Sequence, residues 1–237
     1  LKAYRESLAI RERLAAADRS NTQWQRDLSV SYNKVGDVLV AQGKLDEALK
    51  AYRDSLAIRD RLAAPDRGNT LWQRDLSVSY DKVGDVLVDQ GKLDEALKAY
   101  RDSLAIRERL AATDRSNTQW QRDLSTSDEK VGNVLVVQGK LDEALKAYRD
   151  GLAIMERLAA ADRGNTEWQR GLAISRSKLA SVYERQGGIA DALQELTKAR
   201  DIMAALVAIA PSNTQWKNDL AWFERQIARL QGQAHAQ

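Results

Sequence analysis

The chain has 237 residues and contains no cysteine, one histidine and two prolines. Without cysteine it forms no disulfide, thiolate metal site or cysteine nucleophile, so these classes of chemistry are excluded. Its 37 basic and 34 acidic side chains alternate along the sequence and leave a net charge of +3. Interleaved charges are typical of solvated helix faces. They argue against DNA or RNA as a partner, because binding of nucleic acid requires a face of one positive sign.

One stretch recurs almost unchanged along the chain. The sequence VGDVLVAQGKLDEALKAYRDSLAI begins at Val35 and returns 48 residues later at Val83 and again at Val131, with an altered form at Leu179. Fixed self-similarity over such a distance indicates a stacked repeat array rather than a compact domain. No segment alternates apolar and polar residues as a strand does, so we expect an all-α fold.

The first predicted element is an unpaired helix over residues 1–17, whose apolar face includes Tyr4 and Leu14. After a polar connector, Thr22 and Gln25 have the spacing of a capping box, in which each side chain bonds the backbone N–H of the other residue. This pair predicts that a helix starts at residue 22. The same pair recurs at Thr70/Gln73, Thr118/Gln121 and Thr166/Gln169.

Within each repeat, apolar residues recur at helical spacing on both sides of a glycine such as Gly43, which has the place of a helix-ending residue. Each repeat therefore predicts two amphipathic helices joined by a short turn, and such hairpins must stack to bury their apolar faces. We expect one array over residues 1–237. Its parts are the helix 1–17, hairpins over 22–65, 70–113, 118–161 and 166–210, a capping helix over 214–231, and a tail over 232–237 that holds His235.

The hairpin motif places aromatic, apolar and small residues at fixed positions, which are Tyr32, Val35, Gly36, Leu39, Ala48 and Tyr52. This motif resembles the tetratricopeptide repeat, in which W-x2-L-G-x2-Y is followed by A-x3-F and a proline. Here the first position is Tyr or Asp, the closing proline is missing, and the period is 48 residues instead of 34. The resemblance implies a right-handed superhelical solenoid of extended hairpins. It also implies a non-enzymatic module for protein–protein interaction or scaffolding.

Residues 1–48, 49–96 and 97–144 can be compared position by position. Five of the positions that vary (23, 30, 33, 37 and 41 in the first repeat) lie on one stripe of the first helix of the hairpin. The resemblance assigns this helix to a concave groove and four of these positions to ligand contact. Drift at an exposed face after duplication is the alternative explanation. The second helices hardly vary although they are exposed on one side, which favours a functional stripe.

The candidate groove is graded in character. Its acidic and polar part would select charge, its apolar band would contact the ligand, and a row of arginines would form the far rim. Such a groove suits an extended or helical peptide with a basic and an acidic edge, and so a ligand that contains basic residues. The alternative for the arginines is pairing with a neighbouring carboxylate such as Asp27. The candidate contact residues are Arg26, Val30, Asn33, Asp37, Ala41, Arg74, Val78, Asp81, Asp85, Asp89, Arg122, Thr126, Glu129, Asn133 and Val137.

A tryptophan also recurs once per repeat. Because its neighbours continue an apolar helical face, we assign it to the core between repeats rather than to base stacking. Trp222 instead has the place of Val30 on the groove stripe, where it is either exposed or folded over the end of the array, and we expect it to seal the end. The recurring residues are Trp24, Trp72, Trp120, Trp168 and Trp216.

Three other functions remain open. The bare helix 1–17 offers an apolar face for a homo-oligomer, as a dimer or head-to-tail. The chain begins with Leu inside a repeat, so we expect it to be the C-terminal part of a longer protein, for example the sensor or scaffold region of a signalling protein. Nucleic-acid binding is the third and is disfavoured by charge. We expect no enzyme activity, cofactor, metal or membrane span, and a cytoplasmic location.

Overall fold

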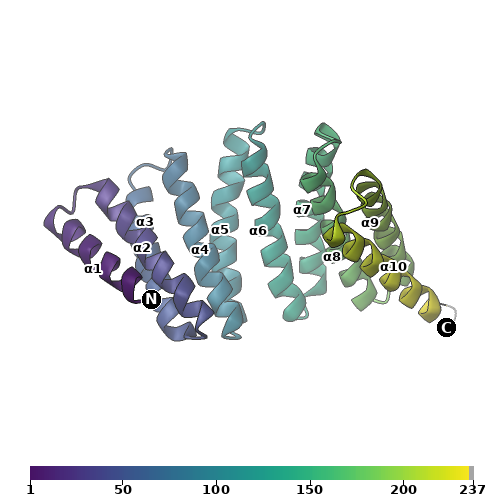
Figure 1. Ribbon diagram of the computed structural model, residues 1–237, viewed down its shortest axis with the longest axis horizontal. Coiled ribbons are helices and arrows are strands. Elements are labelled where there is room, and N and C mark those ends of the chain that lie inside the picture. The colour runs from purple at the N-terminus through teal and green to yellow at the C-terminus, as the bar shows by residue number, and fades with distance from the viewer. Residues whose placement is uncertain (235–237) are drawn as a thin grey trace. The chain divides into compact units, whose positions relative to one another are not determined.

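The computed structural model describes residues 1–234, which form ten α-helices and no strand (Figure 1). The all-α prediction is confirmed. The last helix extends beyond the expected residue 231, and His235 lies outside the described residues. The helices are α1 (Lys2–Ala17), α2 (Thr22–Ala41), α3 (Leu45–Ala63), α4 (Thr70–Asp89), α5 (Leu93–Thr113), α6 (Thr118–Val137), α7 (Leu141–Ala161), α8 (Thr166–Arg185), α9 (Ile189–Ile209) and α10 (Thr214–Ala234).

The chain divides into two compact units, one of residues 1–115 with α1–α5 and one of residues 116–237 with α6–α10. Within each unit, consecutive helices pack against one another in chain order. The hairpins are α2–α3 and α4–α5 in the first unit, and α6–α7 and α8–α9 in the second. We call α2, α4, α6, α8 and α10 the first helices, and α1, α3, α5, α7 and α9 the second helices.

Each hairpin turns at a glycine in the left-handed region of the backbone, which residues with a side chain rarely adopt. Gly43 has a φ of 71°, and Gly91, Gly139 and Gly187 have φ values of 72°, 74° and 81°. Beyond Gly43, the amide of Lys44 donates to the carbonyl of Leu39 over 2.9 Å, as in a Schellman ending. The glycines therefore end the first helices where the sequence predicted.

The predicted capping boxes are wrong, although the helices begin at the predicted threonines. The side chain of Asn21 caps α2, since its Oδ1 accepts from the amide of Trp24 at 3.0 Å. Gln25 instead donates from Nε2 to the carbonyl of Ala15, at the end of the preceding helix. Asparagine satisfies the free amides of the first turn at least as well as threonine, and it lies one residue earlier. The same cap forms at Asn69, Asn117, Asn165 and Asn213.

This geometry predicts different effects for neighbouring substitutions. Asn69→Ala is expected to lower the free energy of unfolding by about 1 kcal/mol, because the amide of Trp72 loses its acceptor. Thr70→Ala, at the adjacent position that the capping-box hypothesis favoured, is expected to change it by much less. Urea denaturation of the two variants distinguishes these expectations. A larger loss for Thr70→Ala than for Asn69→Ala would contradict the asparagine cap.

Glycines also allow the two helices of a hairpin to approach closely. A Cβ added to Gly36 would lie 2.4 Å from Cε1 of Tyr52, so a larger residue must displace the ring. The same contact joins Gly84 to Tyr100 and Gly132 to Tyr148. In the last hairpin the corresponding residues are Ala180 and Leu196, which lie in one apolar cluster of the second unit. The motif on which the resemblance rests is therefore a packing contact.

Candidate partner-binding face on the first helices

Two of the predicted contact residues face the interior. Asn33 and Asp81 are 6% and 8% exposed, so a partner on the surface does not reach their side chains. Asp81 forms an ion pair with Arg107 of α5, with 2.5 Å between Oδ2 and Nη2, and both side chains are buried. The residue that corresponds to Arg107 in α3 is Arg59, which donates to Ser29 Oγ and to the carbonyl of Asp75. Burial lowers the pKa of Arg59.

Sequence reasoning missed these buried arginines. Arg59 and Arg107 recur, together with the half-buried Arg11, at one position of the second helices, which becomes Met155 and Met203 in the second unit. The change from arginine to methionine was the available signal, because methionine in place of a charged residue indicates a buried position. Asn33 and Asp81 therefore belong to the packing of the array and not to its accessible surface.

Asp37 is half-buried and links three helices of the first unit. Its Oδ1 accepts from the hydroxyl of Tyr52 on α3 at 2.7 Å and from Nζ of Lys82 on α4 at 2.6 Å. Lys82 also lies 5.2 Å from the centre of the Tyr52 ring. Burial acts to raise the pKa of Asp37, but the bonds from Lys82 and Tyr52 outweigh it and hold this pKa below its ordinary value of 3.8. Burial and the carboxylate together raise the pKa of Tyr52.

The lowered pKa predicts an acid-sensitive contribution to stability. Asp37 stabilises the fold fully above pH 3.8, its ordinary value, and this contribution is lost as the pH falls through the lower pKa of the folded state. We expect the urea midpoint of the wild type to decrease in this range. Asp37→Asn should show a smaller decrease, and Asn133 at the corresponding position of α6 shows that the array accommodates asparagine. Identical acid profiles for the two proteins would contradict this role of Asp37.

The second unit repeats the arrangement with other side chains. The Oδ1 of Asn133 on α6 accepts from the hydroxyl of Tyr148 at 2.8 Å and from Nζ of Lys178 on α8 at 3.1 Å. Lys178 also lies 3.4 Å from a carboxylate oxygen of Glu129, which is half-buried. A lysine of the following first helix therefore neutralises part of the predicted acidic stripe in each unit.

The predicted arginine row pairs with carboxylates of the following repeat. Arg26 lies 2.7 Å from Asp75, not from Asp27, and Arg170 lies 2.7 Å from Asp219. Glycine replaces the corresponding aspartate at position 171, and Arg122 is 2.5 Å from Glu167 instead. These bridges connect consecutive first helices, so Arg26 serves the stacking of hairpins. Arg74 is exposed on α4.

The remaining predicted contact residues lie at the surface. Val30 and Val78 are half-buried, and Ala41, Asp85 and Asp89 are exposed on α2 and α4. Asp85 accepts from the hydroxyl of Tyr100 at 2.6 Å, and the residue is exposed. On α6 of the second unit the exposed residues are Thr126 and Val137, the latter 65% exposed. The accessible acidic character is thus concentrated at the C-terminal end of α4.

The repeated tryptophans are all half-buried, which agrees with a core position and leaves no free row of rings for base stacking. Trp216, for example, packs against the apolar cluster of α8, α9 and α10. The expectation that Trp222 seals the end of the array is wrong, because this side chain is 42% exposed. Its ring contacts Phe223 edge to face at 5.0 Å, and only Phe223 is buried.

Among residues 1–234, no group of three or more His, Asp or Glu side chains has an arrangement that could hold a metal ion. No helix in the part of the chain that the structure describes is long and apolar enough to cross a membrane.

Comparison with known proteins agrees with the architecture. Residues 27–109 match the family model of the tetratricopeptide repeat, which confirms the resemblance. No curated protein sequence matches the chain. BtubC (BKLC) from P. vanneervenii superposes with a TM-score of 0.62 and 14% identity, over 100% of this chain and 91% of that one. A putative kinesin light chain of Podosopora anserina with nearly identical TPR-like repeats has a TM-score of 0.59 and 18% identity, over 87% and 92%.

A third solved structure, MamA, superposes with a TM-score of 0.53 and 14% identity, over 86% of this chain and 91% of MamA. At these identities the three likenesses show the fold: stacked helical hairpins of the tetratricopeptide type.

Proposed function

Starting from a tetratricopeptide-like fold, we propose that this chain is a non-enzymatic binding module. Its first helices bind a peptide or partner segment, and that ligand contains basic residues. Folds of this family generally mediate protein–protein interaction or scaffolding, and they are typically not catalytic. The observation that carries the proposal is the surface of α4, where the exposed Asp85 and Asp89 share one stripe with the half-buried Val78, about two and three turns further along the helix. An apolar strip beside accessible carboxylates suits a basic, partly apolar ligand.

The packing of the first unit supports this function because it holds the binding face in place before a ligand arrives. The bridge from Arg26 to Asp75 and the bonds of Asp37 to Tyr52 and Lys82 fix α2, α3 and α4 to one another. A preformed face loses little conformational entropy on binding, so more of the contact energy appears as affinity. We also propose a cytoplasmic location for the protein, which cell fractionation tests.

Reversing the accessible charge tests the proposal. Peptides selected by the full chain from a displayed library are titrated calorimetrically against the wild type and against Asp85→Lys/Asp89→Lys. We expect the selected peptides to be enriched in Lys and Arg, and the variant to bind them at least about tenfold more weakly. The matched control is Glu6→Lys/Glu108→Lys, which makes the same change of charge at exposed positions on second helices and should bind normally. Equal affinity for the wild type and Asp85→Lys/Asp89→Lys would falsify the acidic binding face.

Self-association is a second candidate, favoured by the apolar surface of α1. Tyr4, Ile10 and Leu14 are 46%, 52% and 41% exposed. Tyr4 corresponds to Tyr52, whose ring packs against a glycine of the neighbouring first helix. In α10 the position of that glycine is occupied by Ala228. Docking of α1 on α10 of another copy in the hairpin register is therefore disfavoured, and a symmetric contact between two α1 helices is the association we propose. Light scattering should show a concentration-dependent mass that Ile10→Glu abolishes, and a constant wild-type mass would exclude it.

A further inference from the structure

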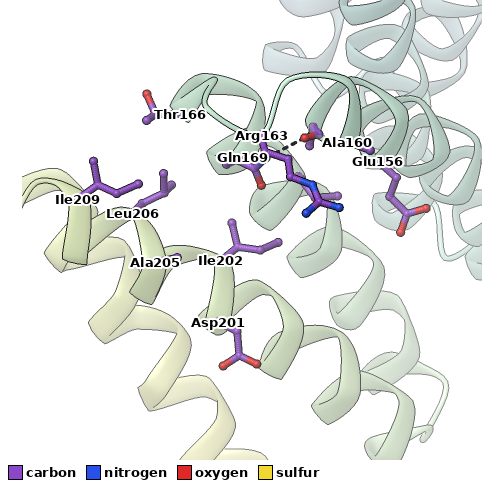
Figure 2. A pocket seen from close by; sticks show the side chains of 12 residues that line it. Glu156, Ala160, Arg163, Thr166, Gln169, Asp201, Ile202, Ala205, Leu206 and Ile209 are labelled. Atoms are coloured by element: carbon purple, nitrogen blue, oxygen red, sulfur yellow. Dashed lines mark hydrogen bonds between the residues drawn. The ribbon is translucent and has the colours of Figure 1, made fainter.

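The second unit contains a cavity of about 640 Å³ between α7, α8 and α9 (Figure 2). Its size falls within the ordinary range for binding pockets. Side chains of α9 form its apolar wall, and Leu172 of α8 also lines it. The α9 residues are Ile202, Ala205, Leu206 and Ile209, which Figure 2 shows on one wall, opposite α7. Ile209 is 70% exposed, so part of this apolar wall faces solvent.

The corresponding place in the first unit, between α3, α4 and α5, has a cavity of only about 290 Å³. Arg109 and Tyr80 line it, and the residues two repeats later are Ala205 and Arg176. The change from arginine to alanine removes a long side chain. Arg176 does not replace the tyrosine ring in the lining, because its guanidinium bonds Glu156 at 2.6 Å and Glu195 at 2.5 Å. Two substitutions have thus enlarged this cavity relative to its repeat equivalent.

The charges at the edge of the cavity indicate what it accepts. The carboxylates of Glu156 on α7 and Asp201 on α9 belong to the lining and are 47% and 64% exposed. The pair of Asp201 with Arg200 lies at the surface, so it contributes little and can be exchanged for a ligand's cation. Glu156 pairs with Arg176, whose side chain is only 13% exposed and is also held by Glu195, so a ligand's cation joins this pair rather than replacing it. Arg163, in the connector between α7 and α8, contributes one positive charge to the lining. The cavity is therefore apolar inside and mainly acidic at its edge.

We propose that this cavity, the α9 pocket, receives a large apolar side chain from an amphipathic helix of a protein partner, which also carries Lys or Arg about one turn from that residue. Residues three or four apart on a helix lie on one face, so a single helix presents both groups to α7 and α9. The inserted side chain covers Leu206 and Ile209, and the cation meets Glu156 and Asp201. This contact is independent of the face on α2 and α4, and it gives the second unit a binding site of its own.

The test uses a displayed library of amphipathic helices, selected on the full chain and counter-selected on Ala205→Arg. Arginine is the chain's own residue at positions 61, 109 and 157, so this variant is expected to fold while filling the pocket. Selected helices should share an apolar anchor with an adjacent Lys or Arg and bind Ala205→Arg at least about tenfold more weakly. The control Ala208→Arg makes the same change at an exposed position of α9 that does not line the pocket, and should bind normally.

Two further variants keep the proposal testable if Ala205→Arg unfolds. Ile209→Ser removes an exposed part of the wall and should also weaken binding, while Asp201→Lys should shift the selected helices toward Asp or Glu at the second position. Failure to enrich any helix that distinguishes the wild type from the filled variant would overturn the α9 pocket, and so would equal binding to Ile209→Ser. Because Asp85→Lys/Asp89→Lys leaves this site intact, failure of one proposal is distinguishable from failure of the other.

Discussion

Gly84→Ala is expected to lower the free energy of unfolding by about 2 kcal/mol, although alanine is the better helix former by about 1 kcal/mol. The reason is steric. The new Cβ would lie 2.5 Å from Cε1 of Tyr100, whose ring is 4% exposed and is held at its far end by the bond to Asp85. The ring cannot move aside without breaking that bond or separating α4 from α5. Urea denaturation of the full chain measures the loss.

The last hairpin supplies the matched rescue for this prediction. It has Ala180 and Leu196 where α4 and α5 have Gly84 and Tyr100, so the fold already uses an alanine with a smaller partner. Gly84→Ala/Tyr100→Leu should therefore be more stable than the sum of the two single losses allows. Additive losses would show that the close approach of glycine and tyrosine does not determine the spacing of the helices.

Asp81→Ser is expected to cost about 3 kcal/mol or more, because it removes the carboxylate that faces a buried guanidinium. The pair of Asp81 and Arg107 is nearly inaccessible, with side chains 11% and 8% exposed. Removing one partner leaves a charge in a place of low dielectric, whereas replacing both avoids that cost. Urea denaturation measures the free energy of unfolding of Asp81→Ser and of the double variant Asp81→Ser/Arg107→Met.

The double variant reproduces residues that the array already contains, since Ser177 and Met203 have these two places in the last hairpin. We expect it to recover most of the stability that Asp81→Ser loses. If the double variant is as unstable as Asp81→Ser, the loss of stability does not come from the unpaired charge of Arg107. In the first hairpin Asn33 and Arg59 occupy the positions of Asp81 and Arg107. Asp81→Asn is therefore expected to lower the free energy of unfolding less than Asp81→Ser does.

The repeat made most of the local fold predictable from sequence. A turn glycine such as Gly43 and a packing pair such as Gly36 and Tyr52 act through short contacts inside one hairpin, so a single repeat contains the whole pattern. The prediction of capping boxes was wrong for two reasons. Asn21 and Thr22 are both good cap residues, so the sequence alone does not decide between them. The side-chain amide of Gln25 also bonds the preceding helix, a contact that the capping-box pattern does not include.

The candidate site was less predictable because its contacts cross between repeats. The partner of Arg26 is 49 residues away at Asp75, and that of Asp37 is 45 residues away at Lys82. Matching the variable stripe to the family's ligand positions also placed Asn33 at the surface, where the structure buries it. Burial depends on how a following helix docks, and helical periodicity within one element does not determine that.

The most direct test of the central proposal is site-specific photo-crosslinking of a selected basic peptide to the full chain. A photoreactive residue replaces Asp89 on the exposed stripe of α4 in one protein and the exposed Ala105 on the second helix α5 in another. The proposal predicts efficient crosslinking from position 89, competed by unlabelled peptide, and only background from position 105. Efficient crosslinking from position 105 with none from position 89 would contradict a binding face on the first helices.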